Sequence, residues 1–104
     1  MMNLSTFISV FNQQDMNRNY QFQQVVFSVP DGFKVRMYCK AELALLYFPQ
    51  AANSVNARRM LMRMLVRCKE CYRMLCSMGY QRGLHTFTPM MVACIVHYCG
   101  VPPD

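Results

Sequence analysis

The segment KAELALLYFPQAANSVNARRMLMRMLVR, residues 40–67, decides the fold. Leucine and tyrosine side chains recur at helical spacing in its first part, which predicts a short helix. Pro49 ends that helix because the residue before a proline avoids the helical region. Asn53 or Ser54 can then cap a second helix by accepting hydrogen bonds from its free N–H groups, so we expect a helix over about 54–67.

The predicted helix 54–67 has two faces of opposite character. Apolar side chains repeat at helical spacing on one face, namely Ala57, Leu61, Met64, Leu65 and Cys68. Arginines form the other face, namely Arg59, Arg63 and Arg67, with Arg58 beside the first of them. A helix of this kind buries its apolar stripe in a core and presents its charges to water or to a ligand.

A short helix, a break and a second helix with outward polar side chains are typical of a helix-turn-helix, whose second helix lies in the major groove of DNA. Arginine binds guanine edges or phosphates there. The candidate nucleic-acid-binding residues are Ser54, Asn56, Arg58, Arg59, Arg63, Arg67 and Lys69. The connection 48–53 is longer than the usual turn of three or four residues. The alternative is that these arginines are only the solvated face of an amphipathic helix.

Positive charge is concentrated around this helix. The chain carries 11 Lys and Arg against 5 Asp and Glu, a formal net charge of +6. Between residues 54 and 82, seven cations face one acid, Glu70. Like charges at this density repel each other, and a polyanion would relieve the repulsion and release its own counterions. Charge alone indicates nucleic acid, an anionic membrane surface or an acidic partner, and a basic surface also serves solubility. Together with the helix-turn-helix pattern, it favours double-stranded DNA as the partner.

The flanking segments predict a β-hairpin and further helices. Strand-forming residues lie on both sides of Pro30-Asp31-Gly32, a turn sequence, so we expect strands near 22–29 and 33–38. The elements predicted after residue 67 are a helix near 69–78, a small strand within 84–87, and a helix from Thr88-Pro89 to about Cys99. The fold class is therefore mainly α with a small β-hairpin (α+β), a small helix-turn-helix-like domain of about four helices.

The chain is long enough for one compact domain. We assign residues 21–104 to this single hairpin-plus-helices domain. Residues 1–20 are interpreted as an N-terminal extension, either a short amphipathic helix or a disordered segment. The apolar positions that fit such a helix are Leu4, Phe7, Ile8 and Phe11.

Four residues are weak candidates for a metal site, namely Cys68, Cys71, Cys94 and His97. Their paired spacings resemble those of zinc ligands. Both pairs fall within or beside predicted helices, however, whereas structural zinc pairs come from loops or glycine-containing knuckles. We therefore expect no metal and no cofactor, and we expect the six cysteines to be thiols.

Neither catalysis nor membrane insertion is expected. No two of the five acids form a close pair and no glycine-rich phosphate loop is present, so we expect no enzyme and no small-molecule substrate. No apolar run approaches the roughly 20 residues of a membrane helix. Residues 1–11 lack the positive start and cleavage site of a secretory signal, so we expect a cytoplasmic protein.

A family resemblance runs through the same region. It begins with the run Tyr38-Cys39-Lys40-Ala41-Glu42-Leu43-Ala44-Leu45-Leu46-Tyr47-Phe48-Pro49 and continues through Ala57-Arg58-Arg59 and Leu61-Met62-Arg63. The block Leu75 to Tyr80, then Phe87-Thr88-Pro89, Val92, Gly100 and Pro102, follows in order. Over roughly residues 33–103 the chain resembles a bacterial family of domains of unknown function, number 4248. The resemblance implies a compact helical domain and no particular activity. Its early helices are similar to the helix-turn-helix of mercury-resistance-type regulators.

Two hypotheses about function remain. The first is a non-catalytic, DNA-binding accessory or regulatory protein of unknown specificity, acting through helix 54–67. A homodimer is compatible with it, because helix-turn-helix proteins usually bind two half-sites as dimers. The second is a protein–protein interaction module, homo- or hetero-oligomeric, with no nucleic-acid role, whose methionine- and cysteine-rich faces bind a partner. Salt separates the two, because a phosphate interface weakens at high salt and an apolar one does not.

Overall fold

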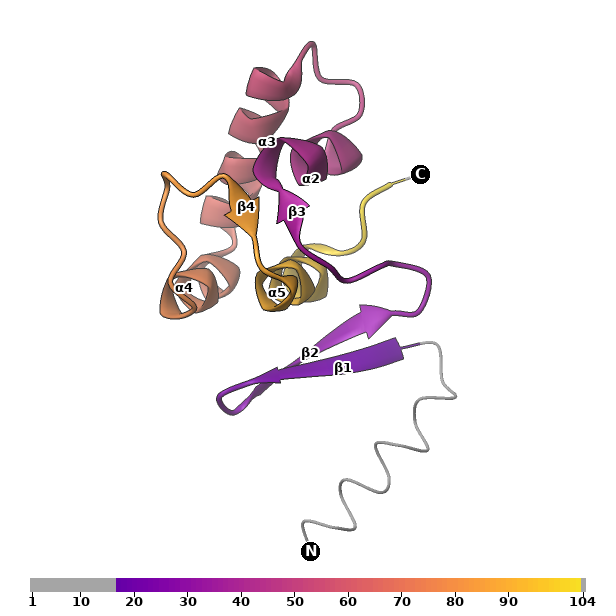
Figure 1. The fold of residues 1–104 in the computed structure, drawn as a ribbon, viewed down its shortest axis with the longest axis vertical. Coiled ribbons are helices and arrows are strands. Elements are labelled where there is room, and N and C mark those ends of the chain that lie inside the picture. Colours follow the sequence, from indigo (N-terminus) through magenta and orange to yellow (C-terminus); the bar gives the residue numbers. More distant parts are fainter. Residues whose placement is uncertain (1–16, 104) are drawn as a thin grey trace, which may run out of the picture.

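The structure is a computed structural model that describes residues 17–103. This part of the chain forms four helices and two small antiparallel sheets (Figure 1). The elements in order are β1 (Asn17–Phe22), β2 (Val25–Pro30), β3 (Tyr38–Cys39), α2 (Lys40–Tyr47), α3 (Ser54–Arg67), α4 (Lys69–Ser77), β4 (Thr86–Phe87) and α5 (Pro89–Cys99). β1 pairs with β2, and β3 pairs with β4. The predicted class, mainly α with a small β-hairpin, is confirmed, and the β3–β4 pair is an addition to it.

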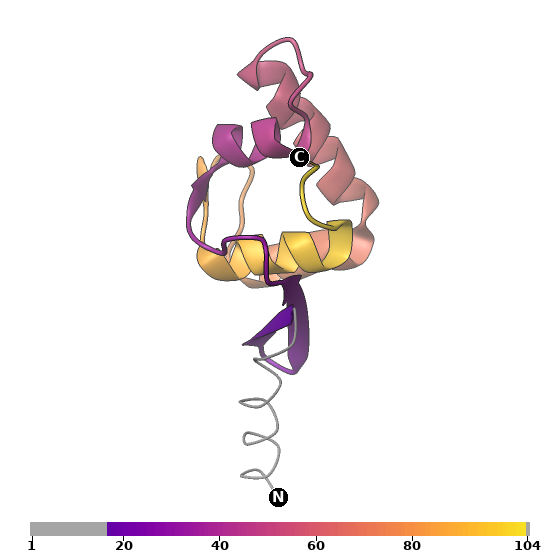
Figure 2. The same ribbon diagram turned by 90° about the vertical axis from the view of Figure 1, so that its right-hand side faces the viewer.

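α5 is the central element of the fold. Figures 1 and 2 show it beside α4 in a middle layer, with the β1–β2 hairpin on one side and α2 and α3 on the other. Every residue from 91 to 96 is buried, because this helix is apolar all round and is covered by its neighbours. Phe27 and Val29 from β2 and Leu61 and Leu65 from α3 reach the same core, and all four side chains are fully buried.

The helices begin where the sequence places capping residues. α3 covers the predicted residues 54–67, and the Asn53 side chain accepts a hydrogen bond from Asn56 N at 2.9 Å. α5 follows Thr88, whose Oγ1 accepts a hydrogen bond from Met91 N at 3.2 Å. Each cap satisfies a backbone N–H group that has no partner inside its helix. All four predicted helices are present, and their ends differ from the predicted ones by about one residue.

The hairpin does not lie where the sequence pattern predicts it. β2 covers most of the first predicted strand, 22–29, but the partner strand near 33–38 is wrong, and the turn at Pro30-Asp31-Gly32 does not join a hairpin. β2 pairs instead with the upstream strand β1 through a tight turn at Gln23-Gln24. Gln23 has a φ of 57°, yet this turn carries no glycine or asparagine, the usual signal of a two-residue hairpin turn. The missing signal is one reason why the pattern hides the hairpin.

The composition around β1 is the second reason why the sequence pattern hides the hairpin, although the side chains of β1 alternate. Arg18, Tyr20 and Phe22 are half-buried, while Asn19 and Gln21 are exposed. This period of two is typical of a strand with one face on a core. It lies within a stretch so rich in asparagine and glutamine that its composition indicates a linker.

The turn at Pro30 leads into an irregular segment rather than a strand. Phe33 N donates a hydrogen bond to Pro30 O at 3.3 Å, and the next strand, β3, starts only at Tyr38. The strand near 33–38 is predicted because Phe33, Val35 and Met37 alternate with Lys34 and Arg36, which would turn Met37 inward. In the structure Met37 is instead 59% exposed. β3 pairs with β4, which confirms the small strand predicted within 84–87.

The boundary of the predicted N-terminal extension falls inside the hairpin. β1 begins at Asn17, so the last residues of the segment 1–20 pair with β2. The short helix expected in that segment falls on residues 1–16, which lie outside the described part of the chain. Within residues 17–103, no helix combines the length and the apolar character needed to cross a membrane.

Candidate nucleic-acid interface

α3 turns one face to the core and its arginines outward. Its apolar face is fully buried at Ala57, Leu61 and Leu65 and half-buried at Met64 and Cys68. The arginine side chains are half-buried at Arg58 and exposed at Arg59, Arg63 and Arg67. The two faces predicted from spacing are therefore present, and burial of the first directs the second toward a ligand or water.

A groove of about 570 Å³ runs along α3 and brings cations from three parts of the chain together. We call it the basic groove. It is lined by Lys40, Val55, Arg58, Arg59, Met62, Arg63, Val66 and Arg82. Five of these residues are Lys or Arg, and none is acidic. The other three are apolar, and two of them, Val55 and Val66, are 46% and 43% exposed.

The basic groove contains some of the residues predicted from the sequence and not others. Arg58, Arg59 and Arg63 line it together. Arg67 lines a second groove with Arg63, and Lys69 is exposed at the start of α4. Ser54 and Asn56 are half-buried at the start of α3 and line neither groove. The structure thus brings together three of the four predicted arginines, whereas Arg67, Lys69 and the two polar residues lie outside the basic groove.

Lys40 and Arg82 complete the basic groove, and the predicted set lacks both. Arg82 contributes to the local charge excess in the sequence, but nothing there indicates that it meets α3. A lysine at the first position of a helix is normally solvent-exposed, but only 8% of Lys40 is exposed. A buried lysine has no sequence signal of its own, because its burial depends on the loop that folds over it.

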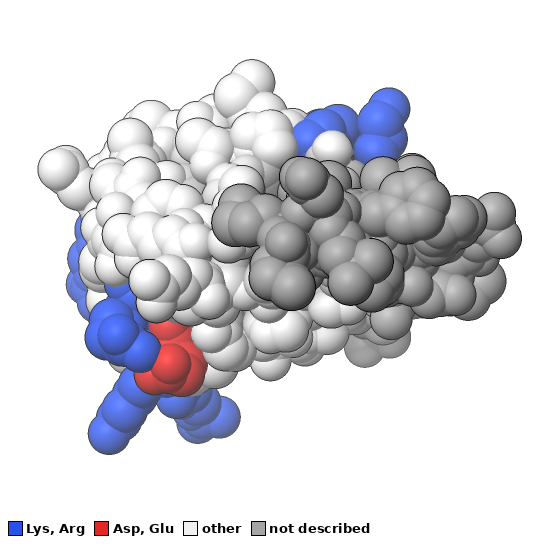
Figure 3. Space-filling view, turned by 90° about the horizontal axis from the view of Figure 1, so that it is seen from below, with Lys and Arg blue, Asp and Glu red and all other residues white. Residues whose placement is uncertain are grey.

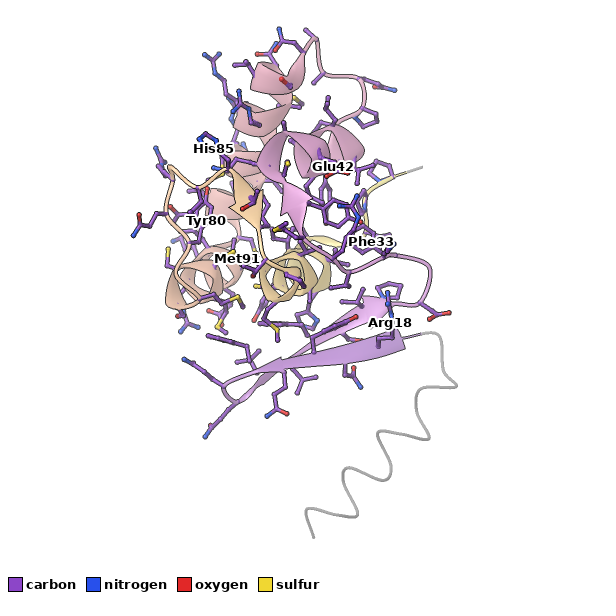
Figure 4. The ribbon with its side chains drawn as sticks, viewed as in Figure 1. Arg18, Phe33, Glu42, Tyr80, His85 and Met91 are labelled. Atoms are coloured by element: carbon purple, nitrogen blue, oxygen red, sulfur yellow. The ribbon has the colours of Figure 1, made fainter. Side chains whose placement is uncertain are left out.

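The segment that joins α4 to β4 folds over Lys40, and Figure 4 shows Tyr80 and His85 along it. Lys40 N donates to His85 O at 2.6 Å, next to the β3–β4 pair. Lys40 Nζ donates to the Tyr80 hydroxyl at 2.8 Å and to Arg82 O at 3.1 Å. The Tyr80 hydroxyl donates in turn to Met62 Sδ at 3.1 Å. Among the described residues, the ammonium group is therefore held in place by neutral groups.

Carboxylates within residues 17–103 do not balance the charge of the basic groove. The acids in that range are Asp31, Glu42 and Glu70, which pair with Arg18, Arg36 and Arg73 at 4.0, 2.6 and 2.7 Å respectively. None of these arginines lines the groove. Burial lowers the pKa of Lys40, and the positive charges of Arg58 and Arg82 lower it further. The groove is therefore a site of one sign, suited to an anion.

The hairpin end of the molecule has a different surface. Figure 3 shows that the middle of its described surface carries neither basic nor acidic side chains, and that Lys and Arg lie toward its edges. The described part of this end is therefore less basic than the groove along α3.

The second groove shares Arg63 with the basic groove and has a volume of about 550 Å³. Its lining is Phe48, Met60, Arg63, Met64, Arg67, Cys68, Tyr98 and Cys99. Most of these side chains are apolar, aromatic or sulfur-containing, so the character of the surface changes from one side of α3 to the other. This groove suits an apolar partner better than a phosphate backbone.

The four weak metal candidates are engaged in other contacts. Cys71 and Cys94 are fully buried, and Cys94 Sγ donates to Cys71 O at 3.9 Å. His97 Nδ1 accepts a hydrogen bond from Ser28 N at 2.9 Å, so His97 ties α5 to the hairpin. Cys68 is half-buried in the second groove. Among residues 17–103, no three His, Cys, Asp or Glu side chains form a group that could hold a metal ion.

Comparison with known proteins assigns the family. No curated protein and no solved structure matches the chain. The model of a family described as Domain of unknown function (DUF4248) matches residues 34–102. The match takes in all four helices, β3, β4 and every residue of the basic groove, while the β1–β2 hairpin lies outside it. The chain therefore belongs to the DUF4248 family, as its sequence resemblance predicts.

Proposed function

We propose that this protein binds double-stranded DNA in the bacterial cytoplasm, as a non-catalytic accessory or regulatory protein, with α3 as its recognition helix. The observation that carries the proposal is the basic groove. Five cations line it along an outward face of α3, and every carboxylate within residues 17–103 pairs with an arginine elsewhere. A phosphate backbone is the polyanion that would neutralise so many cations at once.

The arrangement of α2 and α3 suits this role. α2 packs against α3, as the bracing helix of a helix-turn-helix packs against its recognition helix. α3 has 14 residues, a length of about 21 Å at 1.5 Å per residue. Arg59 and Arg63 lie one turn apart on its exposed side. They can therefore contact successive phosphates or guanine edges along the major groove.

The apolar lining of the basic groove adds a second kind of contact. Val55 and Val66 lie among the arginines and are nearly half exposed. Apolar side chains in a recognition helix contact thymine methyl groups in the major groove. The proposal therefore includes some base contact as well as charge neutralisation.

The test is fluorescence anisotropy of a labelled random duplex at about 50 and about 200 mM salt. Each phosphate contact weakens binding about 3.5-fold over this fourfold change of salt, because the log–log slope is about −0.9 per contact. Two or more contacts by the groove arginines therefore predict a loss of at least about tenfold. Arg59→Ala and Arg63→Ala should each reduce the slope by about one unit.

Lys34→Ala is the matched control, since it removes one exposed positive charge that does not line the groove. Its salt slope should equal that of the original chain. If Arg59→Ala and Arg63→Ala leave the slope unchanged, or if Lys34→Ala lowers it equally, α3 is not the DNA-binding element.

The second groove favours an alternative function, a protein–protein interaction that includes self-association. Phe48, Met60 and Tyr98 give it an apolar surface beside α3. A homodimer through this surface is also compatible with DNA binding, because helix-turn-helix proteins bind two half-sites as dimers. Sedimentation at low and high salt distinguishes the cases. A dimer that persists at high salt and is lost in Met60→Asp uses this groove, whereas a monomer under all conditions removes the alternative of self-association.

A further inference from the structure

Lys40 is a buried cation whose hydrogen bonds within residues 17–103 leave one ammonium proton unused. Its ammonium group carries three protons, and the structure accounts for two of them, at the Tyr80 hydroxyl and at Arg82 O. Both acceptors are neutral, and no carboxylate within residues 17–103 pairs with Lys40. A buried ammonium without a counterion is costly, and bound anions are one way in which proteins offset that cost.

Arg58 supplies a second, independent sign of a missing anion. Its Nε is buried from solvent and has no hydrogen-bond acceptor among residues 17–103. Buried donors are nearly always paired, so an unpaired one indicates a partner that the described chain does not supply. Arg58 and Lys40 line the same groove, together with Arg82 from the loop above them.

We propose that Lys40, Arg58 and Arg82 form an oxoanion site that binds one phosphate group at the Lys40 end of the basic groove. A phosphate has several acceptor oxygens, which can take the unused protons of Lys40 and Arg58 together. It also neutralises the mutual repulsion of three cations that come from α2, α3 and the α4–β4 loop. The lowered pKa of Lys40 agrees with this arrangement, since desolvation and those two arginines are its causes.

Lys40 is particularly suited to a direct test, because the chain has only three lysines, at positions 34, 40 and 69. With carbon-13-labelled lysine, the three Cε signals of the full chain can be followed by NMR during a titration with inorganic phosphate. A parallel titration with chloride at matched ionic strength is the control. The Lys40 signal should shift saturably with phosphate and its pKa should rise, while Lys34 and Lys69, both exposed, respond alike to the two salts. A Lys40 signal that moves no more than the other two overturns the proposal.

Two variants test the other ligands without touching Lys40. Arg58→Gln and Arg82→Gln each remove a charge but keep a polar side chain, and each should weaken phosphate binding at Lys40 roughly tenfold or more. Arg67→Gln is the matched control, because Arg67 lines only the second groove, and it should leave the phosphate affinity unchanged. Equal weakening by all three variants would indicate general charge attraction and would also overturn the site.

The phosphate can belong to a DNA backbone, in which case the site rests on the proposed function, or to a free phosphate ester. A titration with an unlabelled duplex separates the two sources. If the duplex shifts the Lys40 signal and phosphate competes with it, the site binds a backbone phosphodiester. If only phosphate shifts that signal, the site binds a free ester. A duplex that fails to bind while phosphate shifts Lys40 refutes the proposed function alone, and a duplex that binds while Lys40 responds to neither ligand refutes the oxoanion site alone.

Discussion

A comparison of Phe27→Ala with Met37→Ala tests the hairpin that the structure contains against the one that the sequence pattern predicts. In the structure, Phe27 lies on β2 and is fully buried, with its ring centroid 5.7 Å from that of His97 and 6.1 Å from that of Tyr98 on α5. Met37 lies in the irregular segment and is 59% exposed. In the predicted hairpin, Met37 would instead be an inward residue of the second strand.

The two variants should differ several-fold in how much unfolding free energy they lose. Removing a fully buried phenylalanine side chain costs about 3–5 kcal/mol, from lost burial and from the cavity that remains. Phe27→Ala should therefore lose a large part of the roughly 5–15 kcal/mol that stabilises a domain of this size. Met37→Ala removes a mostly solvated side chain and should change the free energy of unfolding by less than about 0.5 kcal/mol.

Urea unfolding monitored by circular dichroism measures both changes. With a slope of about 1.5 kcal/mol per M, the midpoint should fall by about 2–3 M for Phe27→Ala and hardly at all for Met37→Ala. Phe27→Leu, with an expected loss of about 1 kcal/mol, keeps the test valid if the alanine variant does not fold. A loss at Met37 equal to or greater than the loss at Phe27 would refute the observed pairing and support a hairpin of strands 22–29 and 33–38.

Two further predictions concern α5 and its surroundings. In urea melts, Thr88→Ala should lower the free energy of unfolding by about 1 kcal/mol, because Met91 N loses its capping acceptor. Thr88→Ser keeps the hydroxyl and should lower it hardly at all. Equal losses in the two variants would show that the hydroxyl is not the cap. The Tyr47 hydroxyl donates to Gly100 O at 2.5 Å, and burial raises the pKa of Tyr47 above the usual value of about 10. Its contribution to the free energy of unfolding is therefore complete below about pH 10 and is lost as the pH rises further. Tyr47→Phe should therefore lose about 1 kcal/mol at neutral pH and show a shallower alkaline decline in urea melts, and an unchanged decline would contradict this.

The helices could be predicted from the sequence because their signals are local. Asn53 and Thr88 are caps whose acceptors lie three residues before the N–H groups they satisfy, and Pro49 closes α2 by a steric clash with its neighbour. The hairpin could not, because its turn at Gln23-Gln24 has no glycine or asparagine. Which strands form the hairpin depends on how it packs on α5. That packing includes the hydrogen bond between Ser28 and His97, which are 69 positions apart in the sequence.

The candidate site was predictable on α3 and not beyond it. Helical spacing alone places Arg59 and Arg63 on the outward face, since the apolar stripe must turn inward. Lys40 and Arg82 join them through a loop whose path follows from tertiary packing, and the burial of Lys40 cannot be derived from local spacing. The sequence therefore indicates a positively charged helix, and the fold adds Lys40 and Arg82 beside it to form the basic groove.

The β1–β2 hairpin determines how far the chain can be truncated without loss of its core. The family match starts at residue 34, beyond the end of β2, yet Phe27 and Val29 on β2 are fully buried against the rest of the core. A chain truncated at the edge of the match would uncover the side of α5 that carries His97 and Tyr98 and would leave apolar surface open to aggregation. The stretch shared with other family members is thus shorter than the stretch that folds as one unit.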